Sequence, residues 1–281
     1  VFAANCNKWI GQAGFSVDSL SEVEIPLPDI EIQHQIVARI EALLSEVREM
    51  REINQRIIGD TRQLLGAFLN QIFENLPGKE NKPIDEVGFV KGGKRLPKGE
   101  NFAIQPTPYP YLRVTDFRNF GIDESDLRYL TPEVHAQIRN YIISDQDVFI
   151  SIAGTIGLVG TVPTHLNGSN LTENAAKIVF RPEYQDKIKN KYLMYFLASP
   201  QGKKQIEART KAAGQPKLAL ERIKTITFPY IDSIIQQELI IEKIEAVQSE
   251  VTEMLRAQQA DETLINQLEE SILAQAFQGK L

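Results

Sequence analysis

The amino-acid sequence predicts an α+β fold in which a sheet-rich domain lies between two long helices. Three observations support this prediction. One segment of the chain occurs twice, both copies carry apolar residues at coiled-coil spacing, and the region between them consists of short runs rich in β-branched and aromatic residues. The sequence therefore indicates a helical module present in two copies, with a different domain inserted between them.

The two copies are related by a nearly constant offset. Gly11-Gln12 recurs 203 residues later as Gly214-Gln215, and Ile40–Ala42 recurs 204 residues later as Ile244–Ala246. Solenoid repeats have periods of roughly 20 to 50 residues, so this offset indicates one large module present twice. The offset of 204 holds in three later pairs, Met50 and Met254, Leu69 and Leu273, and Phe73 and Phe277.

The register of the copies also predicts how the chain is divided. Residues 1–14 match the end of the inserted region, 199–217, so we expect residues 1–19 to be the remnant of a first domain of the same kind. On this interpretation Val1 is a fragmentary or artificial start. The first helical copy then occupies residues 20–78, the inserted domain residues 79–230, and the second helical copy residues 231–281.

Each copy contains a long helix with coiled-coil spacing. The seam residues alternate at intervals of 4 and 3, the a/d register of a left-handed coiled coil, although an amphipathic surface helix gives a similar stripe. Asn54 and Gln258 occupy equivalent central positions, where a polar residue fixes the register at some cost in stability. The predicted seam consists of Ile40, Leu43, Val47, Met50, Asn54 and Ile57, and of Ile244, Val247, Val251, Met254, Gln258 and Ile265.

The ends of these helices carry sequence signals. Asp29 and Ser233 precede the two heptad runs and are suited to cap a helix N-terminus, whereas Pro77-Gly78 ends the first helix. Short strand-like runs at residues 20–25 and 223–228 lead into the two helices.

The region between the helices has a different composition. Runs rich in Val, Ile, Phe and Tyr are separated by Gly, Pro, Asn and Asp, as in a sheet with tight turns. Two later segments, 192–198 and 203–211, have helical character. The expected strand runs are 84–90, 111–114, 147–152, 158–162 and 176–180.

Charge is distributed unevenly along the chain. The net formal charge is −6, but residues 77–230 contain 22 Lys and Arg against 16 Asp and Glu, and the remaining residues contain 9 against 21. The inserted domain is therefore basic and the helical copies are acidic, which permits phosphate contact by the insert alone. The sequence contains no apolar run of about 18 residues, so no membrane span is predicted. The single cysteine, Cys6, fits the reducing cytoplasm.

The sequence lacks the signatures of common catalytic sites. We find no Walker phosphate loop, no Gly-x-Gly-x-x-Gly after a strand, and no Asn-Pro-Pro-aromatic motif of amino-methyltransferases. The three histidines are scattered, and Asp145 and Asp147 are more typical of a turn than of a nuclease pair. We therefore predict a protein without catalytic residues, without a metal site and without a cofactor of its own.

Four segments of the insert contain side chains suited to DNA contact. Loop 91–99 combines cations with glycines, which lets side chains and backbone approach phosphates together, although a solvated surface loop has the same composition. Arg113 suits either a guanine edge or an ion pair with a nearby Asp, and 151–157 forms either a DNA-facing turn or a plain hairpin. The candidate residues are Lys91, Lys94, Arg95, Lys98, Arg113, Thr115, Arg118, Ser151, Thr155, Lys211, Gln215 and Lys217.

The arrangement as a whole resembles the specificity subunit of type I restriction-modification systems. The resemblance rests on the two heptad helices, Pro110–Phe117, the Ile150–Gly157 turn, Gly214–Lys217 and Gln236-Gln237. It covers nearly the whole chain but lacks the body of a first target recognition domain. It implies a non-catalytic, sequence-specific DNA-binding protein of the cytoplasm, in which the insert is the second target recognition domain.

The resemblance also implies partners. In that family two target recognition domains each read one half of a bipartite sequence in double-stranded DNA, and the conserved helices form an antiparallel coiled coil between them. Modification subunits, which carry S-adenosylmethionine, would dock on the helices, and a restriction subunit with motor and nuclease activity would join. Two alternatives remain open: a coiled-coil scaffold protein, and the recognition part of a fused restriction-methylation enzyme.

Overall fold

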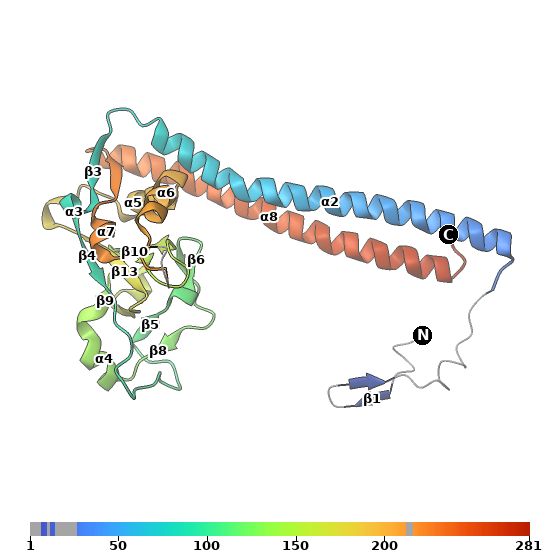
Figure 1. Cartoon of the computed structure of the whole chain (residues 1–281), viewed down its shortest axis with the longest axis horizontal. Coiled ribbons are helices and arrows are strands. Elements are labelled where there is room, and N and C mark those ends of the chain that lie inside the picture. Colours follow the sequence, from blue (N-terminus) through green and yellow to red (C-terminus); the bar gives the residue numbers. More distant parts are fainter. Residues whose placement is uncertain (1–6, 10–11, 15–26, 212–215) are drawn as a thin grey trace. The chain divides into compact units, whose positions relative to one another are not determined.

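The computed structural model describes residues 7–9, 12–14, 27–211 and 216–281 (Figure 1). The chain forms two compact units, one made of Val1–Ile58 with Arg256–Leu281 and the other of Gly59–Leu255. The predicted strand-like run 20–25 and the candidate Gln215 lie outside the described residues. Within the described residues, no helix carries a stretch both long and apolar enough to cross a bilayer.

Two long helices pass through both units. They are α2, Ile30–Glu74, and α8, Ile234–Phe277. Ser233 caps α8 as expected, because its hydroxyl accepts a hydrogen bond from the backbone N–H of Gln236 at 3.3 Å. At the C-terminal end of α2, the ammonium of Lys79 donates to the backbone oxygens of Phe73 and Glu74 at 3.1 and 2.8 Å. These bonds satisfy carbonyls that have no partner within the helix. Gly78 adopts a φ of +66°, which suits the turn after a helix.

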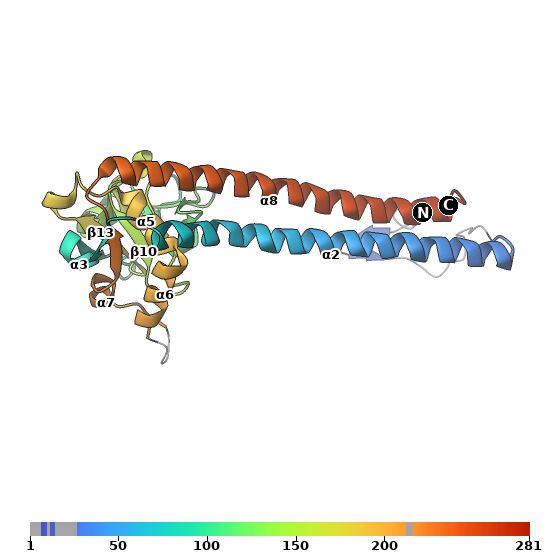
Figure 2. The same cartoon turned by 90° about the horizontal axis from the view of Figure 1, so that it is seen from above.

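In the first unit the two helices run antiparallel, side by side in both views (Figures 1 and 2). Arg51 of α2 donates to Asn266 at 3.1 Å and pairs with Glu269 of α8 at 2.5 Å. The side-chain amide of Asn54 donates to the backbone oxygen of Gln258 at 3.1 Å. Asn54 and Gln258 are equivalent residues of the repeat and are both buried, so the two copies meet around their shared polar centre. This unit also contains the hairpin of β1, Asn7–Trp9, and β2, Gln12–Gly14.

The buried stripe of α2 differs in part from the predicted seam. Val47, Asn54 and Thr61 are buried at intervals of seven, and Ile40 and Leu43 are half-buried. Met50 and Ile57 were expected in the seam, but their side chains are exposed at 40% and 45%. The half-buried positions are instead one residue further on, at Arg51, Ile58, Leu65 and Ile72.

The same correction applies to α8. Ile244, Val251 and Gln258 are buried and Val247 and Ile265 half-buried, whereas Met254 is 45% exposed. The residue after it, Leu255, is half-buried. On both helices the seam therefore keeps most of the predicted positions, but the residue after Met50, Ile57 and Met254 takes the place of each of these three. The sequence offers two adjacent apolar stripes at heptad spacing, and periodicity by itself does not determine which one is covered.

The second unit contains two four-stranded sheets. The first has the order β11-β10-β13-β4 and is antiparallel throughout; the second has the order β8-β5-β12-β9, with only β5 and β12 parallel. The strands of the first sheet are β4, Gly88–Gly92; β10, Val148–Ser151; β11, Val159–Gly160; and β13, Ala175–Phe180. Those of the second are β5, Pro110–Leu112; β8, Arg128–Tyr129; β9, Ile142–Ile143; and β12, Ser169–Leu171.

The described residues of this unit also form two smaller sheets. β3, Glu80–Pro83, pairs antiparallel with β14, Thr227–Tyr230, so the chain enters and leaves the inserted region through neighbouring strands. β6, Phe117–Arg118, pairs with β7, Gly121–Ile122. The shorter helices are α3, Ile84–Val87; α4, Pro132–Ile138; α5, Asn190–Ala198; α6, Pro200–Arg209; α7, Leu220–Lys224; and the 3₁₀ turns Val114–Asp116, Arg139–Tyr141, Thr164–Leu166 and Pro182–Tyr184.

Most sheet expectations agree with these strands, with two corrections. Residues 84–87 form the helical turn α3 rather than the start of a strand, because Asp85 and Glu86 favour the first turn of a helix. Ile223 belongs to α7 rather than to a strand, and its buried side chain faces the core. Apolar runs of this length fit either a strand or a short helix, so local sequence does not distinguish them.

The end of α2 is part of the core of the second unit. Phe73 is completely buried and its ring meets those of Tyr192 and Phe196 edge-on at 5.6 and 5.4 Å. At the equivalent positions of the repeat, Leu273 and Phe277 of α8 are 38% and 73% exposed. Identical residues in the two copies therefore have opposite surroundings.

We predict that Phe73→Ala lowers the free energy of unfolding by about 3 to 5 kcal/mol, because it leaves a cavity beside the rings of Tyr192 and Phe196. Phe277→Ala is the matched control at the equivalent position and should change it by less than about 0.5 kcal/mol, since the ring is exposed. Chemical denaturation of both variants measures the difference. Equal effects of the two substitutions would contradict this account of the core.

Candidate nucleic-acid interface

Three connecting segments meet at the same end of the strands of the first sheet. β4 ends at Gly92, which is opposite Ala176, and β10 ends at Ser151, which is opposite Ala175, the first residue of β13. Because neighbouring strands are antiparallel, the segments after β4, after β10 and before β13 emerge together. We call this edge, with the segments 93–98, 152–158 and 172–174, the sheet end.

A fourth segment, which follows α6 in the chain, joins the sheet end. Lys217 forms bridges with Ala153 and Lys211, and the N–H of Leu218 donates to the backbone oxygen of Ile152 at 3.0 Å. The exposed side chains of Lys211 and Lys217 therefore lie beside the 152–158 turn. These two lysines are distant in sequence from the loop after β4, and only the tertiary fold brings both groups to one edge.

The loop after β4 is held firmly at its start. The N–H groups of Gly93 and Lys94 donate to the backbone oxygens of Ala175 and Leu171 at 3.0 and 2.8 Å. A Cβ on Gly93 would lie 2.1 Å from the backbone oxygen of Thr172, so this close approach requires glycine.

The hydroxyl of Tyr111 also holds this loop in place. It donates to the backbone oxygen of Lys94 at 2.9 Å, and burial raises the pKa of Tyr111 to about 12, so the donor keeps its proton at neutral pH.

Exposed cations lie on this anchored loop and on the strand before it. Lys91, Lys94, Arg95 and Lys98 are all exposed. Arg95 is 75% exposed and forms one ion pair with Glu173 at 3.3 Å, a surface pair that water and salt weaken. Together with Lys211 and Lys217, these residues give the sheet end a positive surface.

The turn after β10 contains two candidate DNA-contacting residues, Ser151 and Thr155, whose surroundings differ. Ser151 is completely buried; its hydroxyl donates to the backbone oxygen of Thr155 at 2.5 Å and accepts from the N–H of Leu158 at 2.8 Å. Ser151 therefore shapes the turn and does not reach a ligand, which corrects the sequence-based expectation. Thr155 is exposed within the turn.

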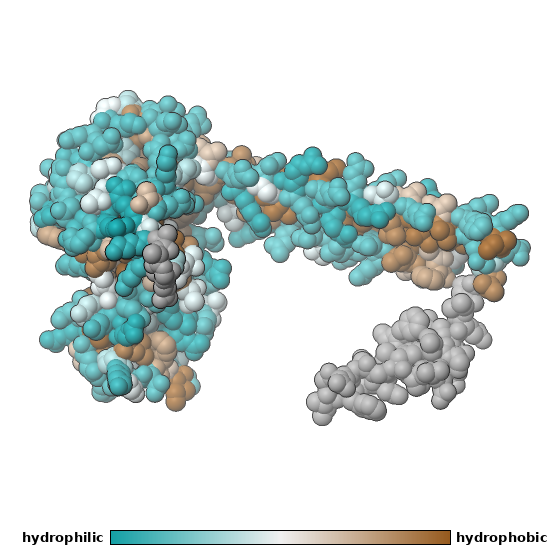
Figure 3. Space-filling model, viewed as in Figure 1, coloured by the Kyte–Doolittle hydropathy of each residue, from teal (hydrophilic) through white to brown (hydrophobic). Residues whose placement is uncertain are grey.

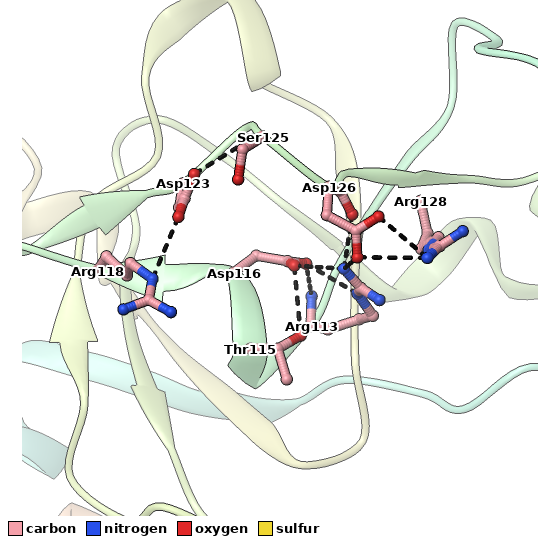
Figure 4. Close-up of polar contacts among 8 residues, drawn as sticks. All are labelled: Arg113, Thr115, Asp116, Arg118, Asp123, Ser125, Asp126 and Arg128. Atoms are coloured by element: carbon pink, nitrogen blue, oxygen red, sulfur yellow. Dashed lines mark hydrogen bonds and ion pairs between the residues drawn. The ribbon is translucent and has the colours of Figure 1, made fainter. Parts of the chain in front are cut away.

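Arg113 is also committed within the protein (Figure 4). Its guanidinium makes two bonds to the carboxylate of Asp116, at 3.2 and 2.7 Å, and two to Asp126, at 2.6 Å to the backbone oxygen and 3.1 Å to the carboxylate. Asp116 is buried. Of the two roles considered for Arg113, the structure therefore favours the internal ion pair.

The bond from Arg113 holds the pKa of the Asp126 carboxyl below its usual range. A lowered pKa in the folded state means that this contribution to stability is present above the unfolded pKa and is lost as the pH falls through the folded value.

The neighbouring candidates remain accessible. Arg118 is 67% exposed and has a single pair with Asp123 at 3.1 Å (Figure 4). Thr115 is exposed, and its hydroxyl donates to the Asp116 carboxylate at 3.3 Å. Thr115 lies in the 3₁₀ turn after β5 and Arg118 in β6, and neither belongs to the segments of the sheet end.

Asn174 and Tyr141 were missed by the sequence analysis. Asn174 is exposed in the turn before β13, at the centre of the sheet end. The ring of Tyr141 lies 5.7 Å from the ammonium of Lys94 and is partly exposed. An Asn after Thr-Glu suggested only a turn, and Tyr141 has no local signal, since its neighbour Lys94 is far away in sequence.

The aspartates considered as a nuclease pair have structural roles. Asp147 is 3% exposed, pairs with Lys177 at 2.8 Å, and accepts from the N–H of Ser144 at 2.9 Å. Asp145 lies in the same turn, where its backbone oxygen accepts from Asn190 at 2.7 Å. Across the described ranges, no three His, Cys, Asp or Glu side chains gather in a way that would hold a metal ion.

We predict that Arg113→Ala lowers the free energy of unfolding by about 3 kcal/mol, because it leaves the buried carboxylate of Asp116 without its cation. The control, Arg118→Ala, removes an exposed pair and should cost less than about 1 kcal/mol. Thermal or urea unfolding distinguishes the two. A cost for Arg113→Ala as small as that for Arg118→Ala would refute the structural role.

Comparisons with known proteins agree on one family. The family profile of the type I restriction modification DNA specificity domain matches residues 78–261. The chain is 28% identical over 286 residues to the specificity subunit of the type I restriction enzyme EcoBI from Escherichia coli, covering 94% of this chain and 59% of that protein. The chain thus spans about three fifths of the length of that relative.

Two solved structures are similar in fold. One is a chain from work on complex assembly and conformational transition of the type I R-M system, with a TM-score of 0.74, 23% identity, and coverage of 92% of this chain and 62% of that chain. The other is the crystal structure of the HsdS subunit from Thermoanaerobacter tengcongensis, with a TM-score of 0.58, 22% identity, and coverage of 100% and 66%. With a basic sheet domain between two long repeated helices, and a profile match over more than half of its length, the chain belongs to the type I restriction modification DNA specificity family.

Proposed function

We propose that this chain is a sequence-specific DNA-recognition subunit of a type I restriction-modification complex, and that the sheet end is its DNA-binding surface. The observation that carries the proposal is that five exposed cations lie on the sheet end or on the segment that joins it, with a sixth, Lys91, on β4 directly before it. Phosphate contacts supply most of the affinity of DNA-binding proteins, and they need cations on one accessible face. The residues are Lys91, Lys94, Arg95, Lys98, Lys211 and Lys217.

The repeat supports recognition of one half of a bipartite target. Leu69 and Phe73 are buried against the sheet domain, whereas their equivalents Leu273 and Phe277 are exposed. An exposed apolar face with the same residues suits a second domain of the same kind. The polar pairing of Asn54 with Gln258 would set the distance between two such readers, because it holds the helices in one register.

The chemistry of modification and cleavage would belong to partners. We infer that this chain is non-catalytic and binds no cofactor itself, and that S-adenosylmethionine is held by modification subunits. A restriction subunit with motor and nuclease activity would complete the complex. Since the substrate is cellular DNA, the complex would work in the cytoplasm.

The helix pair offers a surface for the modification subunits. In the first unit, an open groove of about 390 Å³ is lined by six apolar side chains together with Asn54 and Asp261. Five of the six are 40% to 61% exposed, and Figure 3 shows hydrophobic residues gathering on the helix pair. Exposed apolar patches of this kind mark protein interfaces. The six residues are Met50, Ile53, Ile57, Leu264, Ile265 and Leu268.

We predict that Lys94→Gln/Lys217→Gln weakens duplex binding and makes the plot of log affinity against log salt less steep by about 1 to 2 units, because each lost phosphate contact removes about 0.9. The control, Lys187→Gln/Lys191→Gln, removes two exposed cations beyond the opposite end of β13. It should leave the slope unchanged. Equal slopes for both double variants, measured by fluorescence anisotropy of the full chain with its modification subunits, would exclude the sheet end.

We predict that Ile53→Asp/Leu264→Asp weakens association with modification subunits at least about 100-fold, because two carboxylates would be buried without partners. Gln55→Asp/Gln259→Asp adds the same charge at exposed positions and should have little effect. Analytical ultracentrifugation of the mixed subunits provides the measurement. If the first variant still assembles with the modification subunits, they dock at a different surface.

A further inference from the structure

The central turn of the sheet end holds one polar side chain in a fixed position. The backbone oxygen of Asn174 accepts hydrogen bonds from the N–H groups of Ile152 and Ala153 at 2.8 and 3.3 Å. On the other side, the N–H of Ala175 donates to the oxygen of Thr172 at 3.1 Å and closes the turn. The Cα of Asn174 is therefore held from both flanks, and only two side-chain torsions remain free.

The side-chain carboxamide of Asn174, unlike its backbone, is available for hydrogen bonding. Over the described residues, its carboxamide has no hydrogen bond to the protein, although the side chain is exposed. The adjacent Glu173 differs, because its carboxylate already accepts from Thr172 at 3.1 Å and pairs with Arg95 at 3.3 Å. Ser151 is likewise saturated within its own turn. Asn174 is thus the side chain of this turn with both a donor and an acceptor to offer.

The position of Asn174 relates it to the cations. The loop carrying Lys94 and Arg95 bonds to one side of its turn, through Leu171 and Ala175. The segment carrying Lys217 bonds to the other side, through Ala153. If the cations on both sides of this turn contact phosphates of the two DNA strands, the turn itself faces the groove between those strands.

We propose that Asn174 is a specificity-determining residue that reads an adenine in the major groove. A carboxamide offers a donor and an acceptor at the spacing of adenine N7 and N6, and no other base edge presents that pair in the same order. The inference deepens the proposed function and rests on it. Asn174 sets which base is preferred, whereas the surrounding cations set how tightly any duplex is held.

The test is selection from a pool of randomised duplexes by the full chain assembled with its modification subunits. The wild-type protein should enrich a motif with an adenine at one position. Asn174→Ala should lose the base preference at that position alone, and its affinity for the wild-type motif should fall about 5- to 150-fold with an unchanged salt slope. Asn174→Asp, which only accepts hydrogen bonds, should shift the preference at the same position toward cytosine.

Asn167→Ala is the matched control, because it removes an exposed asparagine beyond the opposite end of β12. Its selected motif should equal that of the wild type. An unchanged motif in Asn174→Ala, or a uniform loss of affinity with a flatter salt slope, overturns the role of Asn174 while leaving the proposed function intact. A wild-type complex that enriches no motif overturns both.

Discussion

The architecture of the second unit depends on the burial of the end of α2 and the start of α8 in a single core. Phe73 and Leu69 contribute to the same apolar cluster as Ile244 and Ile241, together with the helix α5 and the first sheet. The helices are therefore part of the domain and not appendages to it.

Polar groups refine the same junction. Gln237, near the start of α8, is completely buried, yet its amide accepts from Lys189 at 2.9 Å and donates to the backbone oxygens of Lys187 and Ile231, both at 2.8 Å. A buried amide with all these bonds orients the helix as well as stabilising it, since an unsatisfied polar group there would be costly. The junction is thus specified by both shape and hydrogen bonding.

The candidate interface separates side chains that build the surface from those that are free on it. The loops are held by hydrogen bonds from the side chains of Arg113, Ser151 and Tyr111. Gly93 allows two backbone segments to approach closely. The exposed cations and Asn174 then project from a surface that is already in place. Preorganisation of this kind lowers the entropy lost on binding, which is why structural and contacting residues occur side by side.

The sequence by itself determined the repeated helices, their polar centre at Asn54 and Gln258, the sheet-rich insert and its positive charge. These properties follow from local periodicity and composition, which act within a few residues. Only the tertiary structure decided that Met50 and Ile57 lie at the open groove, that Arg113 and Ser151 are consumed internally, and that Lys94, Asn174 and Lys217 share one edge. Pairing of β4 with β13 joins residues more than 80 positions apart, and its register is set by packing of the whole domain rather than by any local segment.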